Sequence, residues 1–99
     1  MKVLCVLGKY AYGHASRGLG YEYANFLPAL KRLGAEVEVF DSLEREAYAG
    51  FPELNRELLS RAFRFRPDVI LFVLMHYEIW TETLDVLKEE LGAVLLHWA

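Results

Sequence analysis

The chain has 99 residues, which is enough for one small domain with a single hydrophobic core. Hydrophobic residues make up 55% and charged residues 25%, and the formal net charge is −3. This composition is typical of a compact globular protein and argues against a nucleic-acid partner, because polyanion binders carry an excess of Lys and Arg. The longest apolar run, residues 69–75, is far shorter than the ~20 residues of a membrane helix. We therefore expect a cytoplasmic protein without a membrane span.

The first half of the chain predicts a strand, a helix and a second strand. Residues 2–7, "KVLCVL", form a short apolar run, which is typical of a strand covered on both faces. The single cysteine, Cys5, lies in this run, so we expect a buried thiol and no internal disulfide. Apolar residues recur every three or four positions over residues 19–33, which predicts an amphipathic helix. Residues 35–41, "AEVEVFD", alternate apolar and acidic side chains, and this predicts a strand further out in the sheet.

The second half repeats this alternation twice. A helix is predicted from Pro52 to the residue before Pro67, followed by a strand over residues 68–75. Thr81 is the expected N-cap of a third helix, which ends near Gly92. The last apolar run, "AVLLHW", predicts a fourth strand.

Strands that alternate with helices predict the α/β class, here a Rossmann-like three-layer half-domain of four parallel strands and three helices within one domain, residues 1–99. The expected strand order is 3-2-1-4. Strand four then has an open edge, which natural folds pair or cover. We therefore expect the chain to be the N-terminal part of a longer protein or, as the alternative, to form a homodimer through strand four.

Ligands of parallel α/β sheets bind beyond the carboxyl ends of the strands. The long loop after strand one, the loop "MHYEIW" after strand three and the terminal "HWA" all lie at this edge. Each of these three segments holds one of the three histidines, His14, His76 and His97.

The glycines of the first loop do not form a known nucleotide-binding motif. "GLGYEY" places Tyr23 where a dinucleotide fingerprint needs a small residue, although Asp41 ends strand two as a ribose-binding carboxylate would. The Gly-Lys-Ser/Thr of a phosphate-binding P-loop does not occur. No short spacing of ligand side chains indicates a metal site.

Instead, the loop places His14, Ser16 and Arg17 just before a helix N-terminus, a setting that suits a phosphate or a sugar hydroxyl. Tyr12 would stack on a sugar face. A plainer interpretation also holds, in which Arg17 pairs with Glu22, His14 is a solvated loop residue and Tyr12 packs the loop. His76 and Glu78 form either a pair that orients or deprotonates a substrate, or residues that pack and cap the next helix.

The stretch from Gly8 to Asp41, together with "RPDVILF" and the final "HWA", resembles the N-terminal domain of GT-B glycosyltransferases, particularly the CgeB-like (spore maturation) group. The resemblance implies two Rossmann-like domains that face each other across a cleft, the first chiefly on the acceptor side. It implies nucleotide-sugar and acceptor substrates, no cofactor and no catalytic metal. Because the donor-binding domain and its glutamate motif are absent from these residues, we expect no sugar transfer by this chain alone.

The resemblance also assigns roles to particular residues. Arg17 would stabilise phosphate charge, and His14, or His76 with Glu78, would orient or deprotonate an acceptor hydroxyl. The expected catalytic residues are His14, His76 and Glu78, and the expected substrate-binding residues are Tyr12, Gly13, Ser16, Arg17, Gly18 and Tyr77.

Overall fold

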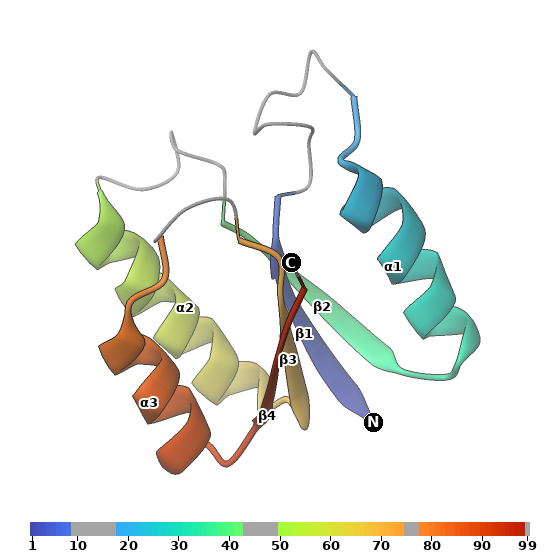
Figure 1. Cartoon of the computed structure of the whole chain (residues 1–99). Coiled ribbons are helices and arrows are strands. Elements are labelled where there is room, and N and C mark those ends of the chain that lie inside the picture. Colours follow the sequence, from blue (N-terminus) through green and yellow to red (C-terminus); the bar gives the residue numbers. More distant parts are fainter. Residues whose placement is uncertain (9–17, 43–49, 75–77, 99) are drawn as a thin grey trace.

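The computed structural model describes residues 1–8, 18–42, 50–74 and 78–98. Strands and helices alternate along the chain as β1 (Lys2–Leu7), α1 (Tyr21–Arg32), β2 (Glu36–Asp41), α2 (Phe51–Phe65), β3 (Val69–Phe72), α3 (Thr81–Glu89) and β4 (Val94–His97). The four strands form one parallel sheet, with α1 on one face and α2 and α3 on the other (Figure 1). The predicted α/β class, with its four parallel strands and three helices, is confirmed.

The order of the strands differs from the prediction. We expected 3-2-1-4, and the sheet has the order β2-β1-β3-β4, so that β3 pairs with β1. The physical reason lies in the side chains: β1 and β3 are the most apolar runs and take the two central places, where both faces are covered. β2 alternates valines with Glu36 and Glu38, and at the edge of the sheet these carboxylates reach solvent.

Two hydrophobic clusters lie on the two faces of the sheet. Under α1, alternate residues of β1 pack with Leu27, and the valines of β2 surround them. On the opposite face, the other residues of β1 and β3 meet α2 and α3, in a larger cluster that includes Leu4, Val6, Phe40, Leu54, Leu58, Ile70, Phe72 and Leu87. The alternation of side chains along each strand therefore supplies both layers of the core.

The last strand, β4, has the least protection. Its outer edge pairs with no other strand of the described chain. Leu95 packs into the cluster under α3, whereas Val94 and Leu96 point to the α1 side and are 57% and 51% exposed. Trp98, just beyond the strand, is 53% exposed and meets the ring of Phe26 edge-on, with 5.3 Å between the ring centroids. Because α1 lies over β1 and β2, it leaves the β4 side of its own face open (Figure 1).

No helix in the described part of the chain is long and apolar enough to cross a membrane.

Cys5 provides a test of the core on the α1 side. Its side chain is fully buried, and burial raises the pKa of the thiol to about 11 from an ordinary 9.0. As the pH rises, the Cys5 thiol of the unfolded chain ionises before the buried thiol of the folded chain, and this ionisation favours unfolding. The contribution of the buried thiol to stability is therefore complete below pH 9 and is lost as the pH rises from about 9 to about 11. We expect a thiol reagent to leave Cys5 unmodified at neutral pH and to react at once in denaturant. Rapid modification of the folded protein would contradict the buried position.

Gly34 provides a test of the end of α1. It has φ +84°, a left-handed conformation that follows the helix, and a Cβ added there would meet no neighbouring atom within 4 Å. Replacing Gly34 with alanine should therefore cost about 1 kcal/mol through the backbone alone, as measured by urea unfolding. Gly50→Ala is the matched control, because Gly50 is extended and its added Cβ would meet Pro52 at an ordinary 3.6 Å. Equal losses of unfolding free energy in Gly34→Ala and Gly50→Ala would exclude the left-handed backbone at Gly34 as the cause.

Candidate ligand site at the carboxyl edge of the sheet

The strand order creates a switch point between β1 and β3. From β1 the chain moves outward to β2 by way of α1, and it then returns past β1 to β3 by way of α2 on the opposite face. β1 and β3 are therefore neighbours, while the helices that follow them, α1 and α3, lie on opposite faces of the sheet (Figure 1). In open parallel sheets this divergence leaves a crevice in which ligands bind. The observed order thus makes neighbours of β1 and β3, the strands after which the two predicted site segments begin, whereas the order 3-2-1-4 would separate them.

Two of the predicted site residues, Gly18 and Glu78, belong to the described part of the chain, and each lies at the boundary of one of the two segments. The other predicted residues lie outside the described residues: Tyr12, Gly13, His14, Ser16, Arg17, His76 and Tyr77.

Gly18 stands two residues before the N-cap of α1. It is exposed and adopts φ +82°, which side chains rarely tolerate. The N-cap itself is Gly20, which has no side chain to bond the first N–H groups of α1. Glycine is therefore required at position 18 by the backbone conformation, whether or not a ligand approaches it.

Glu78 is the most deeply buried carboxyl group of the described chain. Its side chain has 0% exposure, although it follows β3 by only six residues and lies in a loop. Its backbone carbonyl accepts a hydrogen bond of 2.9 Å from Nδ2 of Asn55. Burial of a carboxyl group costs free energy unless hydrogen bonds or charges compensate it. The fold therefore places Glu78 in the interior at a cost that its neighbours must offset.

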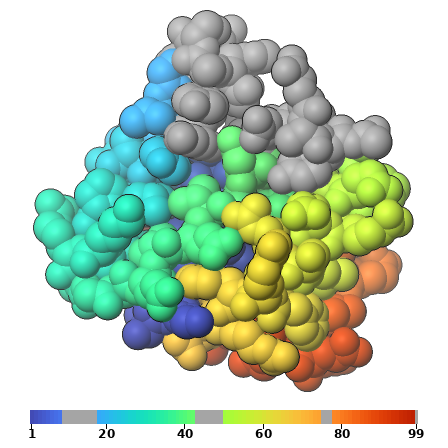
Figure 2. All heavy atoms as spheres, turned by 180° about the vertical axis from the view of Figure 1, so that it is seen from behind, coloured from blue at the N-terminus to red at the C-terminus, as the bar shows by residue number. Residues whose placement is uncertain are grey.

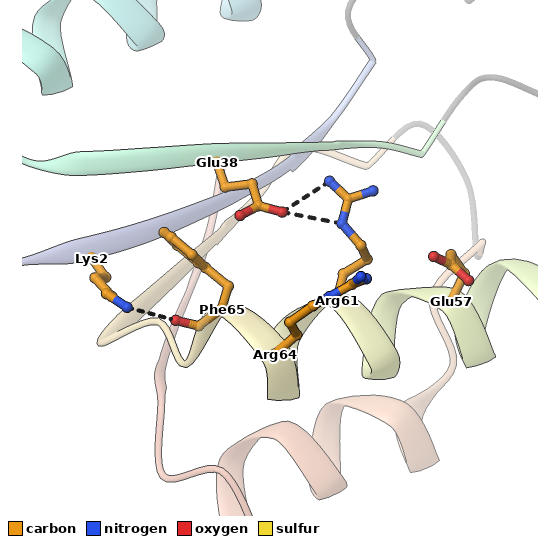
Figure 3. A pocket seen from close by; sticks show the side chains of 6 residues that line it. All are labelled: Lys2, Glu38, Glu57, Arg61, Arg64 and Phe65. Carbon is orange, nitrogen blue, oxygen red and sulfur yellow. Dashed lines mark hydrogen bonds and ion pairs between the residues drawn. The ribbon is translucent and has the colours of Figure 1, made fainter.

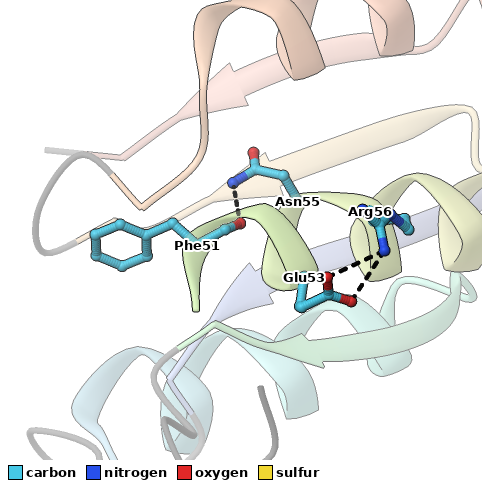
Figure 4. A network of polar contacts seen from close by, with 4 residues as sticks. All are labelled: Phe51, Glu53, Asn55 and Arg56. Atoms are coloured by element: carbon cyan, nitrogen blue, oxygen red, sulfur yellow. Dashed lines mark hydrogen bonds and ion pairs between the residues drawn. The ribbon is translucent and has the colours of Figure 1, made fainter. Parts of the chain in front are cut away.

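Asn55 of α2 holds the loop that contains Glu78. Its Nδ2 donates to the carbonyl oxygens of Phe51 at 2.8 Å and Glu78 at 2.9 Å, and the first of these bonds is drawn in Figure 4. Its Oδ1 accepts from the backbone N–H of Trp80 at 2.9 Å and from Oγ1 of Thr83 at 2.8 Å. All four hydrogen-bonding positions of the amide are used, and the residue is buried, with 3% exposure.

The Asn55 contacts also correct the predicted start of α3. The sequence predicts Thr81 as the N-cap, whereas the N-cap is Trp80 and makes no capping bond with its side chain. Asn55, 25 residues earlier in the chain, accepts a hydrogen bond from the backbone N–H of this N-cap residue and so holds the start of α3 against α2. Glu53 and Arg56, also on α2, form an exposed ion pair (Figure 4). This pair adds little stability, because both groups remain hydrated.

Ser42 is a second buried polar residue at this edge. Its N–H donates to the carbonyl of Leu7 at 3.1 Å and so joins the ends of β2 and β1. The residue has 1% exposure, and its hydroxyl has no hydrogen-bond partner among the described residues. Neither Ser42 nor Asn55 was predicted from the sequence. The available signal for Asn55 was a polar residue on the apolar face of an amphipathic helix, next to Leu54 and Leu58.

His97, the third histidine at this edge, ends β4 and is exposed. Its ring stacks on that of Phe72, with 5.0 Å between the centroids and 14° between the planes. In the described residues, no group of three His, Cys, Asp or Glu side chains could hold a metal ion.

No protein-family model, curated protein or solved structure matches this chain.

Proposed function

We propose that this chain is the acceptor-side part of a glycosyltransferase that moves a sugar from a nucleotide-sugar donor to an acceptor hydroxyl. Its active form includes a second domain that binds the donor, and the 99 residues alone are inactive. The resemblance to the CgeB-like group of GT-B enzymes suggests the reaction. The observation that supports it most directly is the switch point between β1 and β3, with the buried Glu78 beside it.

In this proposal Glu78 acts as the base, or orients a base at His76, for the acceptor hydroxyl. Asn55 holds the backbone at Glu78 and Trp80, so the main chain that carries the carboxyl group is fixed before substrate arrives. A fixed group contributes more to catalysis than a mobile one, because no ordering cost remains when the substrate binds. His14 and Arg17 take the roles that the resemblance gives them, near the acceptor hydroxyl and the donor phosphates.

The test uses the protein encoded by the complete gene. We expect the reading frame to continue past Ala99 into a second α/β domain, and a stop codon directly after Ala99 would contradict the proposal. Arg17→Ala should weaken binding of a nucleotide sugar about tenfold in calorimetric titration, since one charged contact to phosphate is lost. Glu78→Gln should lower kcat about 100-fold and leave donor affinity unchanged.

Glu78→Gln is a suitable variant because the side chains have nearly the same shape and the bond from Asn55 goes to the backbone carbonyl, which the substitution keeps. Arg56→Gln is the matched control, since Arg56 is 73% exposed and pairs with the neighbouring Glu53. Wild-type kcat in Glu78→Gln would remove Glu78 from the catalytic role.

As a second candidate we propose a non-catalytic module that forms a homodimer through β4. The supporting observation is the open edge of β4, where Val94, Leu96 and Trp98 are all more than half exposed. Two β4 strands that pair antiparallel about Leu96 would place Val94 opposite the partner's Trp98, which forms an entirely apolar row. Edge strands of this kind pair with other strands unless charges block them.

Analytical ultracentrifugation of the 99-residue chain tests the second candidate. We expect a dimer that Leu96→Lys converts to a monomer with an unchanged circular dichroism spectrum. Leu33→Lys is the control, because Leu33 is 83% exposed at the end of α1. A wild-type chain that sediments as a monomer at every concentration would exclude the homodimer.

A further inference from the structure

A cavity of about 530 Å³ lies between α2 and the edge strand β2, away from the switch point. It is lined by Lys2, Glu38, Glu57, Arg61, Arg64 and Phe65, which come from β1, β2 and α2 (Figure 3). β2 is an edge strand of the sheet, and Figure 2 shows it between α1 and α2. Its volume lies within the range of small-molecule sites, roughly 300–1,000 Å³.

The lining has three cations and two carboxylates, in a chain whose formal net charge is −3. One cation and one carboxylate are already paired. Nε and Nη2 of Arg61 donate to Oε1 of Glu38 at 3.1 and 3.0 Å, and Nη2 also donates to the carbonyl of Val39 at 3.3 Å. The guanidinium lies 5.9 Å from the ring centroid of Phe40. Arg61 is therefore a fixed donor, and its Nη1 is not used in these bonds.

The two other cations keep donors for a ligand. Nζ of Lys2 donates to the carbonyl of Phe65 at 3.1 Å and lies 5.1 Å from that ring's centroid, which leaves two of its three protons uncommitted. Arg64 makes no hydrogen bond or ion pair with another described residue. A planar guanidinium is suited to bind two oxygens of a phosphate at once.

The carboxylates define the rest of the ligand. Glu57 is exposed on the same side of α2 as Arg61, one turn earlier. Glu38 bonds to Arg61 through Oε1, and its Oε2 takes no part in these bonds. Carboxylate oxygens only accept hydrogen bonds, so they favour a ligand with hydroxyl donors and repel a bare anion. A phosphate attached to a polyhydroxylated body satisfies both sets of groups.

We propose that this cavity is a binding site for a sugar phosphate, in which Arg64 and Lys2 bind the phosphate, Arg61 adds a fixed donor, and Glu57 and Glu38 accept hydrogen bonds from the sugar hydroxyls. The site is separate from the carboxyl edge and does not depend on the proposed function. All six lining residues belong to the part of the chain that the structure describes.

The test is a titration of the 99-residue chain with glucose 6-phosphate, inorganic phosphate and glucose, followed by amide chemical shifts at constant ionic strength. We expect saturable shifts near Lys2, Arg61 and Phe65, with glucose 6-phosphate about tenfold tighter than inorganic phosphate because the hydroxyls add to the phosphate contacts. Glucose alone should bind more weakly than either. Equal affinity for phosphate and glucose 6-phosphate, or shifts confined to the carboxyl edge, would overturn the proposal.

Variants assign the binding to the cavity. Arg64→Gln and Lys2→Gln should each weaken glucose 6-phosphate binding about tenfold, and Glu57→Gln should weaken it while leaving inorganic phosphate binding unchanged or stronger. Arg56→Gln is the matched control, since it removes the same charge from the same helix outside the cavity. Arg64 is exposed on the helix, so its loss leaves the core intact. An Arg64→Gln protein that binds as tightly as Arg56→Gln would exclude the site.

Discussion

Replacing Asn55 with alanine is expected to lower the free energy of unfolding by about 3 kcal/mol. The change removes four hydrogen bonds and leaves the buried hydroxyl of Thr83 and the carbonyl of Glu78 without the partner that they have in the native chain. Urea unfolding followed by circular dichroism measures the loss. Amide exchange should also accelerate at Trp80, whose N–H would no longer be bonded to Asn55.

Asn25→Ala is a matched control for this experiment. Nδ2 of Asn25 donates to the carbonyl of Tyr21 at 2.7 Å, the same bond one turn back that Asn55 makes to Phe51, but Asn25 is exposed. Its loss should change stability by less than about 0.5 kcal/mol. If Asn25→Ala and Asn55→Ala lower the free energy of unfolding equally, the loop contacts of Asn55 contribute nothing to stability.

Leu58→Ala is expected to destabilise the protein by about 3 kcal/mol or more. Leu58 has 0% exposure in the cluster between the sheet and α2, and alanine would leave a cavity in addition to losing apolar contacts. Thermal and urea unfolding both measure this effect. Leu33→Ala is the control, because Leu33 is 83% exposed and should change stability by less than about 0.5 kcal/mol. A tolerated Leu58→Ala would contradict the close packing of α2 against the sheet.

Much of the fold follows from local patterns. The strands and helices lie within a few residues of their predicted positions, since each has a strong apolar period and a glycine or proline near an end. The strand order does not follow from these patterns, because alternating strands and helices allow β3 to pair with either β2 or β1. The apolar character of β3 and the acidic residues of β2 decide between them only when both faces of the assembled sheet are considered.

The candidate site is predicted less completely. The sequence indicates Glu78 from its place after β3, but no local pattern indicates its complete burial. The contacts of Asn55 with Trp80 and Thr83 span 25 and 28 residues, and no local spacing reports such bonds. The cavity at Arg64 likewise joins the start of β1 to the end of α2.

The stretch after β1, which is rich in glycine and tyrosine, is the basis of the proposed activity, and its residues from 9 to 17 lie outside the described residues. By itself the sequence determined the α/β class, the positions of the elements and the segments that reach the carboxyl edge, because these depend on periodicity and on residues close in the chain. Only the tertiary structure decided the strand order, the burial of Glu78, the role of Asn55 and the cavity at the β2 edge. Each of these depends on which distant segments pack together, and that is set by the burial of both faces of the sheet at once.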